Sequence, residues 1–86
     1  MTKKALRAVR AEQLAPNQTV IYVDGSRIFQ SYSSTIAIVT GNKVTLGRDW
    51  DYSRTTGKYR NQFLGEGIAE TRLKLATGEY KYDEEL

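Results

Sequence analysis

The tetrapeptide TTGK at residues 55–58 matches part of a phosphate-binding P-loop. A P-loop needs the pattern G-x-x-x-x-G-K-[ST], because its glycines expose backbone amides to phosphate and the hydroxyl after the lysine binds magnesium. Here the preceding glycine is Gly47, ten residues before Gly57, and Lys58 is followed by Tyr59. We therefore interpret TTGK as a set of helix-capping residues, with weak phosphate binding at a helix N-terminus as the alternative.

Asp49 and Asp51 form the second group that could do chemistry. Two carboxylates two residues apart on a strand share a face, where they could hold magnesium or act as acid and base. No third acid lies nearby in the sequence, and Arg48 and Arg54 flank the pair. We therefore expect a solvated, salt-bridged face, no metal site and no catalytic residue.

Aromatic and cationic residues are interleaved between residues 48 and 60. Single-strand nucleic-acid binders use this composition for stacking and phosphate contact, and protein-binding hot spots use it too. The residues are Trp50, Tyr52, Tyr59, Arg48, Arg54, Lys58 and Arg60. Because strand alternation assigns Trp50 and Tyr52 to the inner face, the predicted binding group reduces to Arg54, Lys58 and Arg60 on the outside.

The amino-acid composition excludes several classes of function. The 86 residues suffice for one domain, and they include no cysteine and no histidine, which removes disulfides, thiolate metal sites and the commonest general base. Residues 1–65 hold ten Lys/Arg against four acids (+6), and residues 66–86 hold three against six (−3). This asymmetry favours an acidic partner, with ordinary solubilising charge as the alternative. No apolar run is long enough for a membrane span or a signal peptide, so we expect a cytoplasmic protein without a cofactor.

These residues must be positioned by a small sheet. The run TVIYV followed by Asp24-Gly25 predicts a strand at 19–23 and a hairpin turn. A second strand should run from Arg27 to Thr40, with a bend or bulge at 31–34, and a third should follow Gly41-Asn42 and extend to Tyr52. A three-residue loop including Lys43 would put Ile36, Ile38 and Leu46 on one face. The pattern favours that loop unless both faces are covered.

Two helices should follow the strands. Helical spacing predicts a helix at about 55–64, capped by Ser53 or Thr55 and ended by Gly65, and another at about 67–77 ended by Gly78. In the second helix Arg72 falls inside an apolar arc, where it either lays its stem over apolar surface or pairs with a partner or a core-edge acid. The arc comprises Ile68, Ala69, Leu73, Leu75 and Ala76.

The two ends of the chain are less regular in pattern. Tyr80 and Tyr82 fit a short edge strand, and residues 2–15 fit a weak helix or a loose basic arm before the break at Pro16-Asn17. The expected fold is therefore α+β: a basic N-terminal segment at 1–17, then a single domain at 18–86. That domain has a three- to four-stranded antiparallel meander packed on one face by the two helices.

The stretches FQSYSSTIAIV, LGRDWDYSRTTGKYRNQFLGE and ETRLKLATGEY resemble a family of small uncharacterised bacteriophage and plasmid proteins, which share a WDYS-TT-K junction and an FL helix end. The resemblance covers residues 18–82. It implies a mobile-element protein of the host cytoplasm that binds and blocks a host or defence component, as anti-CRISPR proteins do. It implies no catalytic activity and no cofactor.

Three functions are therefore open. The first is an inhibitor that occupies the surface of a host protein or protein–nucleic-acid complex, using Arg54, Lys58, Arg60, Arg48 and Arg72. The second is a direct nucleic-acid binder with a basic patch formed by Lys3, Lys4, Arg7, Arg10, Arg54, Lys58 and Arg60. The third is a self-associating protein whose dimer buries a sheet face. The sequence leaves the partner and the choice between monomer and homodimer open.

Overall fold

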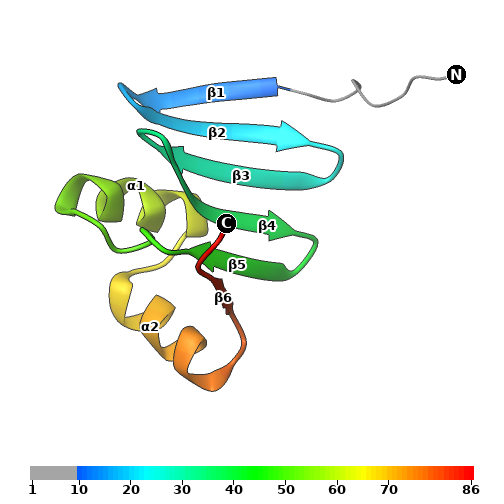
Figure 1. Cartoon of the computed structure of the whole chain (residues 1–86), viewed down its shortest axis with the longest axis vertical. Helices are drawn as coiled ribbons and strands as arrows, with labels where there is room; N and C mark the ends of the chain where they lie inside the picture. The colour runs from blue at the N-terminus through cyan, green and yellow to red at the C-terminus, as the bar shows by residue number, and fades with distance from the viewer. Residues whose placement is uncertain (1–9) are drawn as a thin grey trace, which may run out of the picture.

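The computed structural model describes residues 10–86, which form an α+β fold with one mixed sheet and two helices (Figure 1). The elements follow one another along the chain as β1 (Arg10–Ala15), β2 (Gln18–Val23), β3 (Ser26–Ser31), β4 (Ser34–Thr40), β5 (Lys43–Gly47), α1 (Arg54–Leu64), α2 (Ile68–Thr77) and β6 (Lys81–Asp83). The strands lie in the sheet in that same order. β1 to β5 are an antiparallel meander, and β6 pairs with β5 in parallel.

The sheet has six strands where three or four were predicted. Part of the difference is β1, which occupies residues for which a helix or a basic arm was expected. The helix prediction is wrong for Arg10–Ala15, because these residues pair with β2 across the turn at Pro16-Asn17. The remainder of that prediction, on residues 2–9, lies outside the described residues. The short edge strand predicted from Tyr80 and Tyr82 is confirmed as β6.

A second difference lies at residues 32–33. The single strand predicted from Arg27 to Thr40 is two strands, β3 and β4, joined by a tight turn at Tyr32-Ser33. Tyr32 has a positive φ of 55°, which is uncommon for a residue other than glycine. Its backbone N–H donates to the Asn17 carbonyl at 2.7 Å. The neighbouring β1–β2 turn therefore holds Tyr32 in this conformation.

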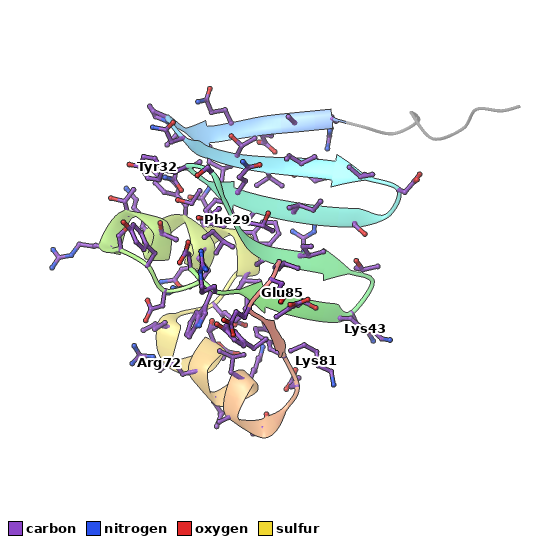
Figure 2. The ribbon with its side chains drawn as sticks, viewed as in Figure 1. Phe29, Tyr32, Lys43, Arg72, Lys81 and Glu85 are labelled. Carbon is purple, nitrogen blue, oxygen red and sulfur yellow. The ribbon has the colours of Figure 1, made fainter. Side chains whose placement is uncertain are left out.

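The core lies on the sheet face that α1 covers, which we call the inner face. One residue from each of four neighbouring strands stands in a directly paired row, namely Val20, Phe29, Ala37 and Leu46. All four are buried, and the Phe29 ring stacks on Phe63 of α1 with centroids 5.7 Å apart. Phe29 lies near the middle of the molecule, where α1 meets the sheet (Figure 2). This row and Phe63 hold the helix on the sheet.

The β4–β5 register differs from the predicted one. Thr40 pairs directly with Lys43, so the loop has two residues, Gly41 and Asn42, and the three-residue loop is wrong. Ile36 is still buried, because a bulge between β3 and β4 leaves it unpaired beside Ala37. Ile38 is directed to the opposite, outer face of the sheet. Apolar residues therefore occupy both faces.

The structure confirms the two predicted helices and the residues that begin and end them. Ser53 caps α1, its hydroxyl accepting from the Thr56 N–H at 3.2 Å, and Gly65 ends the helix with a positive φ. Gly78 ends α2 in the same conformation. The predicted apolar arc of α2 packs only in part, because Leu75 contacts the core while Leu73 is 62% exposed. α2 lies beyond the β6 edge of the sheet (Figure 1), and so α1 alone covers the inner face.

Polar contacts around Glu66 anchor α2. The Glu66 carboxylate accepts from Thr71 at 2.6 Å, from Lys74 at 2.8 Å and from Tyr80 at 2.9 Å. Its side chain is only 4% exposed. Burial acts to raise the pKa of Glu66, but the bonds from Lys74, Thr71 and Tyr80 outweigh burial and the pKa is lowered. The hydrogen bond from Lys74 to Glu66 raises the pKa of Lys74. Burial, and then the separate hydrogen bond from Tyr80 to Glu66, raise the pKa of Tyr80.

The lowered pKa of Glu66 predicts a loss of stability in acid. A carboxyl group whose pKa is lower in the folded state stabilises the fold above its unfolded pKa, about 4.3, and this contribution is lost as pH falls through the folded pKa. We expect Glu66→Gln to flatten the fall of the unfolding free energy below about pH 4. Urea unfolding over a pH series measures this, with exposed Glu79→Gln as the control. Equal acid slopes for wild type and Glu66→Gln would contradict it.

Candidate functional site

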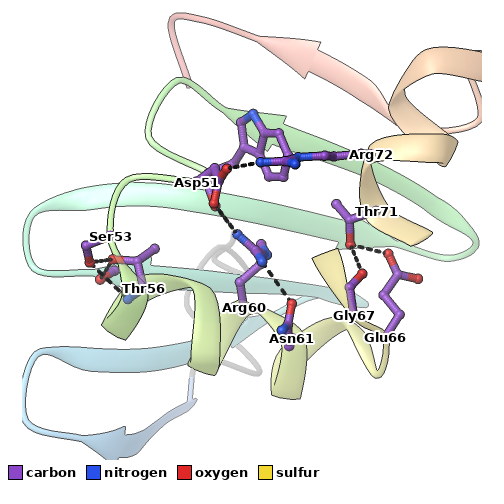
Figure 3. A network of polar contacts seen from close by, with 11 residues as sticks. Asp51, Ser53, Thr56, Arg60, Asn61, Glu66, Gly67, Thr71 and Arg72 are labelled. Atoms are coloured by element: carbon purple, nitrogen blue, oxygen red, sulfur yellow. Dashed lines mark hydrogen bonds and ion pairs between the residues drawn. The ribbon is translucent and has the colours of Figure 1, made fainter. Parts of the chain in front are cut away.

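Arg60 is the most buried charged side chain of the described chain, and it ties α1 to the turns that precede it. It is 2% exposed. One terminal nitrogen donates to the Trp50 carbonyl at 2.9 Å and to Asp51 Oδ1 at 3.2 Å, and the other donates to Asn61 Oδ1 at 2.9 Å (Figure 3). The guanidinium also lies 5.3 Å from the centre of the Trp50 ring. Arg60 therefore holds residues 50 and 51 against α1.

This position corrects the sequence prediction for Arg60. We expected it on the outside of the joint between strand and helix, available to a partner protein or to nucleic acid. Burial rules out that outward placement. An arginine is suited to the observed role, because its planar fork can donate to a carbonyl and a carboxylate at once while its face stacks on an indole ring.

Residues 48–53 form turns instead of the predicted continuation of the strand. β5 ends at Gly47, whose carbonyl accepts from the Trp50 N–H at 3.1 Å, and the Asp49 carbonyl accepts from the Tyr52 N–H at 3.1 Å. Trp50 packs against the core as expected. The expectation that Tyr52 points inward is wrong, because Tyr52 is 72% exposed. Residue 47 must be a glycine, because a Cβ there would collide with the Thr35 carbonyl.

The turns also separate the two aspartates. Asp49 accepts from Ser34 Oγ at 2.7 Å and lies 3.8 Å from Arg48. Asp51 instead bridges Arg60 and Arg72, with Arg72 at 3.1 Å (Figure 3). The expectation of salt-bridged carboxylates is confirmed, and so is the pairing of Arg72 with an acid. Within residues 10–86 no cluster of three or more His, Cys, Asp or Glu side chains could hold a metal ion.

A cleft of about 490 Å³ opens between the β3–β4 turn, the 48–53 turns and the start of α1. Eight of its ten lining residues carry a hydroxyl group. The lining consists of Ser31, Tyr32, Ser33, Ser34, Ile36, Asp49, Tyr52, Ser53, Thr55 and Thr56. Each hydroxyl group can both donate and accept a hydrogen bond, and its hydrogen rotates to suit the partner. The cleft can therefore form hydrogen bonds with many arrangements of polar groups on a ligand.

Only some of these hydroxyls are used inside the protein. Ser31 and Thr56 bond one another at 2.9 Å at the buried floor, Ser34 bonds Asp49, and Ser53 caps α1. Among the described residues, no hydrogen bond is recorded for the side-chain hydroxyls of Ser33, Thr55, Tyr32 or Tyr52. Tyr32 is 57% exposed, so the two tyrosine rings present apolar area to solvent at the cleft.

The TTGK residues lie in the first turns of α1, and the cap is Ser53, so the interpretation of TTGK itself as capping residues is wrong. Thr56 is buried, and its N–H and its hydroxyl both contact Ser53 Oγ. Gly57 lies against the Arg60 guanidinium, and a Cβ added there would come within 3.5 Å of it. A Cβ at this distance would be in ordinary van der Waals contact with the guanidinium, so Gly57 is not required by space alone.

The predicted basic residues do meet at one place. A shallow depression next to the cleft is lined by four of the five predicted partner-binding residues, namely Arg54, Lys58, Arg60 and Arg72. Ser53 lines both the cleft and the depression, so the two are neighbours. The fifth residue, Arg48, lines a different hollow with Glu84 and Leu86, which adjoins the cleft at Ser33, Ser34 and Asp49. We call the exposed side chains Tyr32, Tyr52, Arg54, Lys58 and Arg72 the Tyr/Arg surface.

The wider basic patch predicted for nucleic acid is not assembled in the described residues. Arg10 lies in β1, with its guanidinium 4.3 Å from the centre of the Tyr22 ring. Arg60 is buried. Lys3, Lys4 and Arg7 lie outside the described residues. Of that set only Arg54 and Lys58 are exposed together on one surface.

Sequence reasoning missed the two tyrosines. The alternation of residues 43–52 assigned Tyr52 to the core, and Tyr32 was assigned to the interior of a long strand. The serines around Tyr32 were a signal that could have been used, because QSYSS is typical of an exposed turn and not of a strand.

The fold and the site define a small α+β protein with a hydroxyl-lined cleft beside a basic depression. The chain belongs to a family described as "Family of unknown function (DUF8033)", whose match covers residues 9–80. Comparison with curated proteins and comparison with solved structures gave no match. No helix of residues 10–86 is long and apolar enough to cross a membrane.

The role of Arg60 predicts a marked loss of stability on Arg60→Lys. A lysine keeps the charge but cannot donate in a fork to the Trp50 carbonyl and Asp51 while stacking on the indole. We expect the unfolding free energy to fall by about 1–3 kcal/mol, because a buried polar contact is lost. Exposed Arg54→Lys should change it by less than about 0.5 kcal/mol. Chemical denaturation measures both variants, and equal stabilities would contradict the role assigned to Arg60.

Proposed function

We propose that this protein works by binding a partner protein through the Tyr/Arg surface, without catalysing a reaction. The observation that carries the proposal is the composition of this surface. Two exposed tyrosines stand beside serine and threonine hydroxyls, and three exposed cations lie next to them. Tyrosine and arginine dominate protein-binding hot spots, and tyrosine with serine dominates antibody paratopes.

Rigidity supports the same proposal. Tyr32 is in a two-residue turn tied to the β1–β2 turn, and Tyr52 follows two residues that Arg60 holds. The backbone that carries the two tyrosines is already held in place before binding. Association therefore fixes few further groups, and little conformational entropy is lost. Arg54 and Lys58 add positive charge that would steer an acidic partner face to the surface.

The identity of the partner follows from the resemblance to bacteriophage and plasmid proteins. In that setting the partner is a host protein or a protein–nucleic-acid complex of the host cytoplasm. A component of a defence system such as CRISPR–Cas is the candidate we favour. The protein would inhibit it by occupying a surface that the component needs.

Direct nucleic-acid binding is the second candidate, and the basic depression is the observation that favours it. Phosphate contacts release counterions, so such binding must weaken steeply between low and physiological salt. A fluorescent single-stranded oligonucleotide that binds the protein in this manner, and loses binding on Arg54→Glu with Lys58→Glu, would establish this candidate over protein binding.

The protein-binding proposal predicts that the two tyrosines dominate affinity. We expect the double variant Tyr32→Ala, Tyr52→Ala to lose at least about 30-fold in affinity for the partner, equivalent to one hot spot of about 2 kcal/mol. The partner is first captured from host lysate on the wild-type protein, and affinities are then measured by calorimetry with the purified partner.

The matched control is Tyr82→Ala. Tyr82 is also a half-exposed tyrosine, at 51%, but it lies in β6 away from the cleft. Its variant should bind as the wild type does. If the double variant at Tyr32 and Tyr52 captures and binds the same partner with unchanged affinity, the Tyr/Arg surface is not the binding site.

A further inference from the structure

The outer face of the sheet carries an apolar row that runs across five strands. In the paired register, Ala11, Ile21, Ile28, Ile38 and Thr45 stand opposite one another from β1 to β5. The three isoleucines are adjacent at the centre of the row, and each remains partly exposed. β-branched side chains in direct cross-strand pairs form a close-packed apolar surface.

Charged residues are absent from this face over β1 to β4. The alternation places only uncharged residues beside the row: Gln13, Thr19, Val23, Ser26, Gln30, Thr35 and Thr40. The nearest charged residues of that face are Lys81 of β6, which pairs with Thr45 at the end of the row, and Lys43 at the start of β5. In a chain that is 27% charged, an outer sheet face exposed to water is expected to carry lysine and glutamate. The composition instead suits a face that becomes buried.

Nothing within the described residues covers the row. α1 lies on the inner face through Phe63, and α2 lies beyond β6. Figure 1 shows both helices over one end of the strands or outside the sheet, and the half of β1–β4 near the β2–β3 turn has no element in front of it or behind it. Leu86 packs against Gly47, at the margin of this face.

We propose that the outer face binds the outer face of a second copy of this chain, forming a two-fold symmetric dimer. The argument is self-complementarity, which an isologous interface requires. Over β1 to β5 the row is symmetric about Ile28, with isoleucine on either side and then Ala11 and Thr45, and Lys81 of β6 follows Thr45. A two-fold axis along the row, or along β3, therefore places Ile28 on Ile28 and isoleucine on isoleucine at the neighbouring strands.

The absence of charge adds a second argument for a copy as the occupant. The strands β1 to β4 place no ionised side chain on this face, and Glu84 lies near it only at the margin by Thr35, so little desolvation of unpaired charge opposes association. A nucleic acid or an acidic protein face would find no counter-charge here. Two such sheets would stack about 10 Å apart, as the layers of a β-sandwich do.

The dimer is independent of the Tyr/Arg surface. That surface lies at the end of the strands marked by the β3–β4 turn, and the row crosses the middle of the strands. Both copies would keep the cleft and the basic depression accessible. A dimer would then present two identical binding surfaces to its partner.

Sedimentation velocity over a dilution series of the full chain tests the proposal. We expect a monomer–dimer equilibrium that high salt does not weaken, because no charge pair lies at the interface. Ile28→Lys should weaken dimerisation about 100-fold or more, because an unpaired charge would be buried. Gln62→Lys, on the exposed side of α1, should dimerise as the wild type does. A monomer at all concentrations, or an Ile28→Lys variant as dimeric as wild type, would overturn the proposal.

Ala11→Lys keeps the test valid if Ile28→Lys fails to fold. Ala11 is exposed in the described chain, so the lysine is tolerated in the monomer but lies at the end of the buried row in the dimer. We expect it to weaken dimerisation measurably. Dimerisation equal to that of the wild type would overturn the proposal.

A distance measurement separates face-to-face stacking from pairing of two β1 edges. The chain has no cysteine, so Thr40→Cys, at an exposed position of β4, gives a single spin-label site. Stacked outer faces put the two labels within about 20 Å, from a sheet separation of about 10 Å and strand spacings of about 4.8 Å. Edge pairing through β1 separates them by seven strand spacings, about 34 Å. The longer distance would overturn the stacked dimer.

Discussion

The buried guanidinium of Arg60 is the interaction on which the candidate site depends. An arginine stays charged, so a buried one must be neutralised and hydrogen-bonded. Asp51 supplies the counter-charge, Asn61 of α1 accepts one hydrogen bond, and residue 50 contributes its carbonyl and its indole face. Trp50 and Asp51 belong to the turns between β5 and α1. The same contacts therefore fix the path that directs Tyr52 outward and delivers Ser53 to the start of α1.

A chain of this size has little apolar area to distribute, and here it is divided between two faces of one sheet. α1 covers the inner face, where Phe29 and Phe63 close the core. In the dimer that we propose, the isoleucines of the outer face are buried against the outer face of a second copy. Such a dimer carries two Tyr/Arg surfaces. A partner that is itself a dimer could then bind both surfaces at once. Such bivalent binding raises the apparent affinity without any new contact.

The helices were predictable from the sequence because their signals are local. Ser53, Gly65 and Gly78 act within one turn of the residues they cap or end, and both helices begin and end within a residue of the predicted bounds. The places of the turns at Asp24-Gly25 and Gly41-Asn42 were predictable for the same reason, since Asp24, Gly25 and Gly41 adopt the positive φ angles that tight turns need. The length of the second loop was not predicted correctly.

The features that the sequence did not predict depend on contacts between distant segments. The strand β1 is defined by its pairing with β2 and not by its own residues, which favour a helix. The conformation of Tyr32 depends on the hydrogen bond that its N–H donates to the Asn17 carbonyl. Arg60 has the pattern of a surface residue and is buried because Trp50 and Asp51 fold back over it. For the candidate site, therefore, four basic residues were predicted to lie together, but the cleft and its tyrosines were not.

Amide hydrogen exchange of the protein, free and bound to its captured partner, tests the central claim most directly. The account predicts that binding slows exchange at residues 31–34 and 49–58, which form the cleft and the start of α1. Exchange in β6 should be unchanged. Protection confined to α2 and β6, with no slowing around Tyr32 and Tyr52, would contradict the claim that this protein binds its partner through the Tyr/Arg surface.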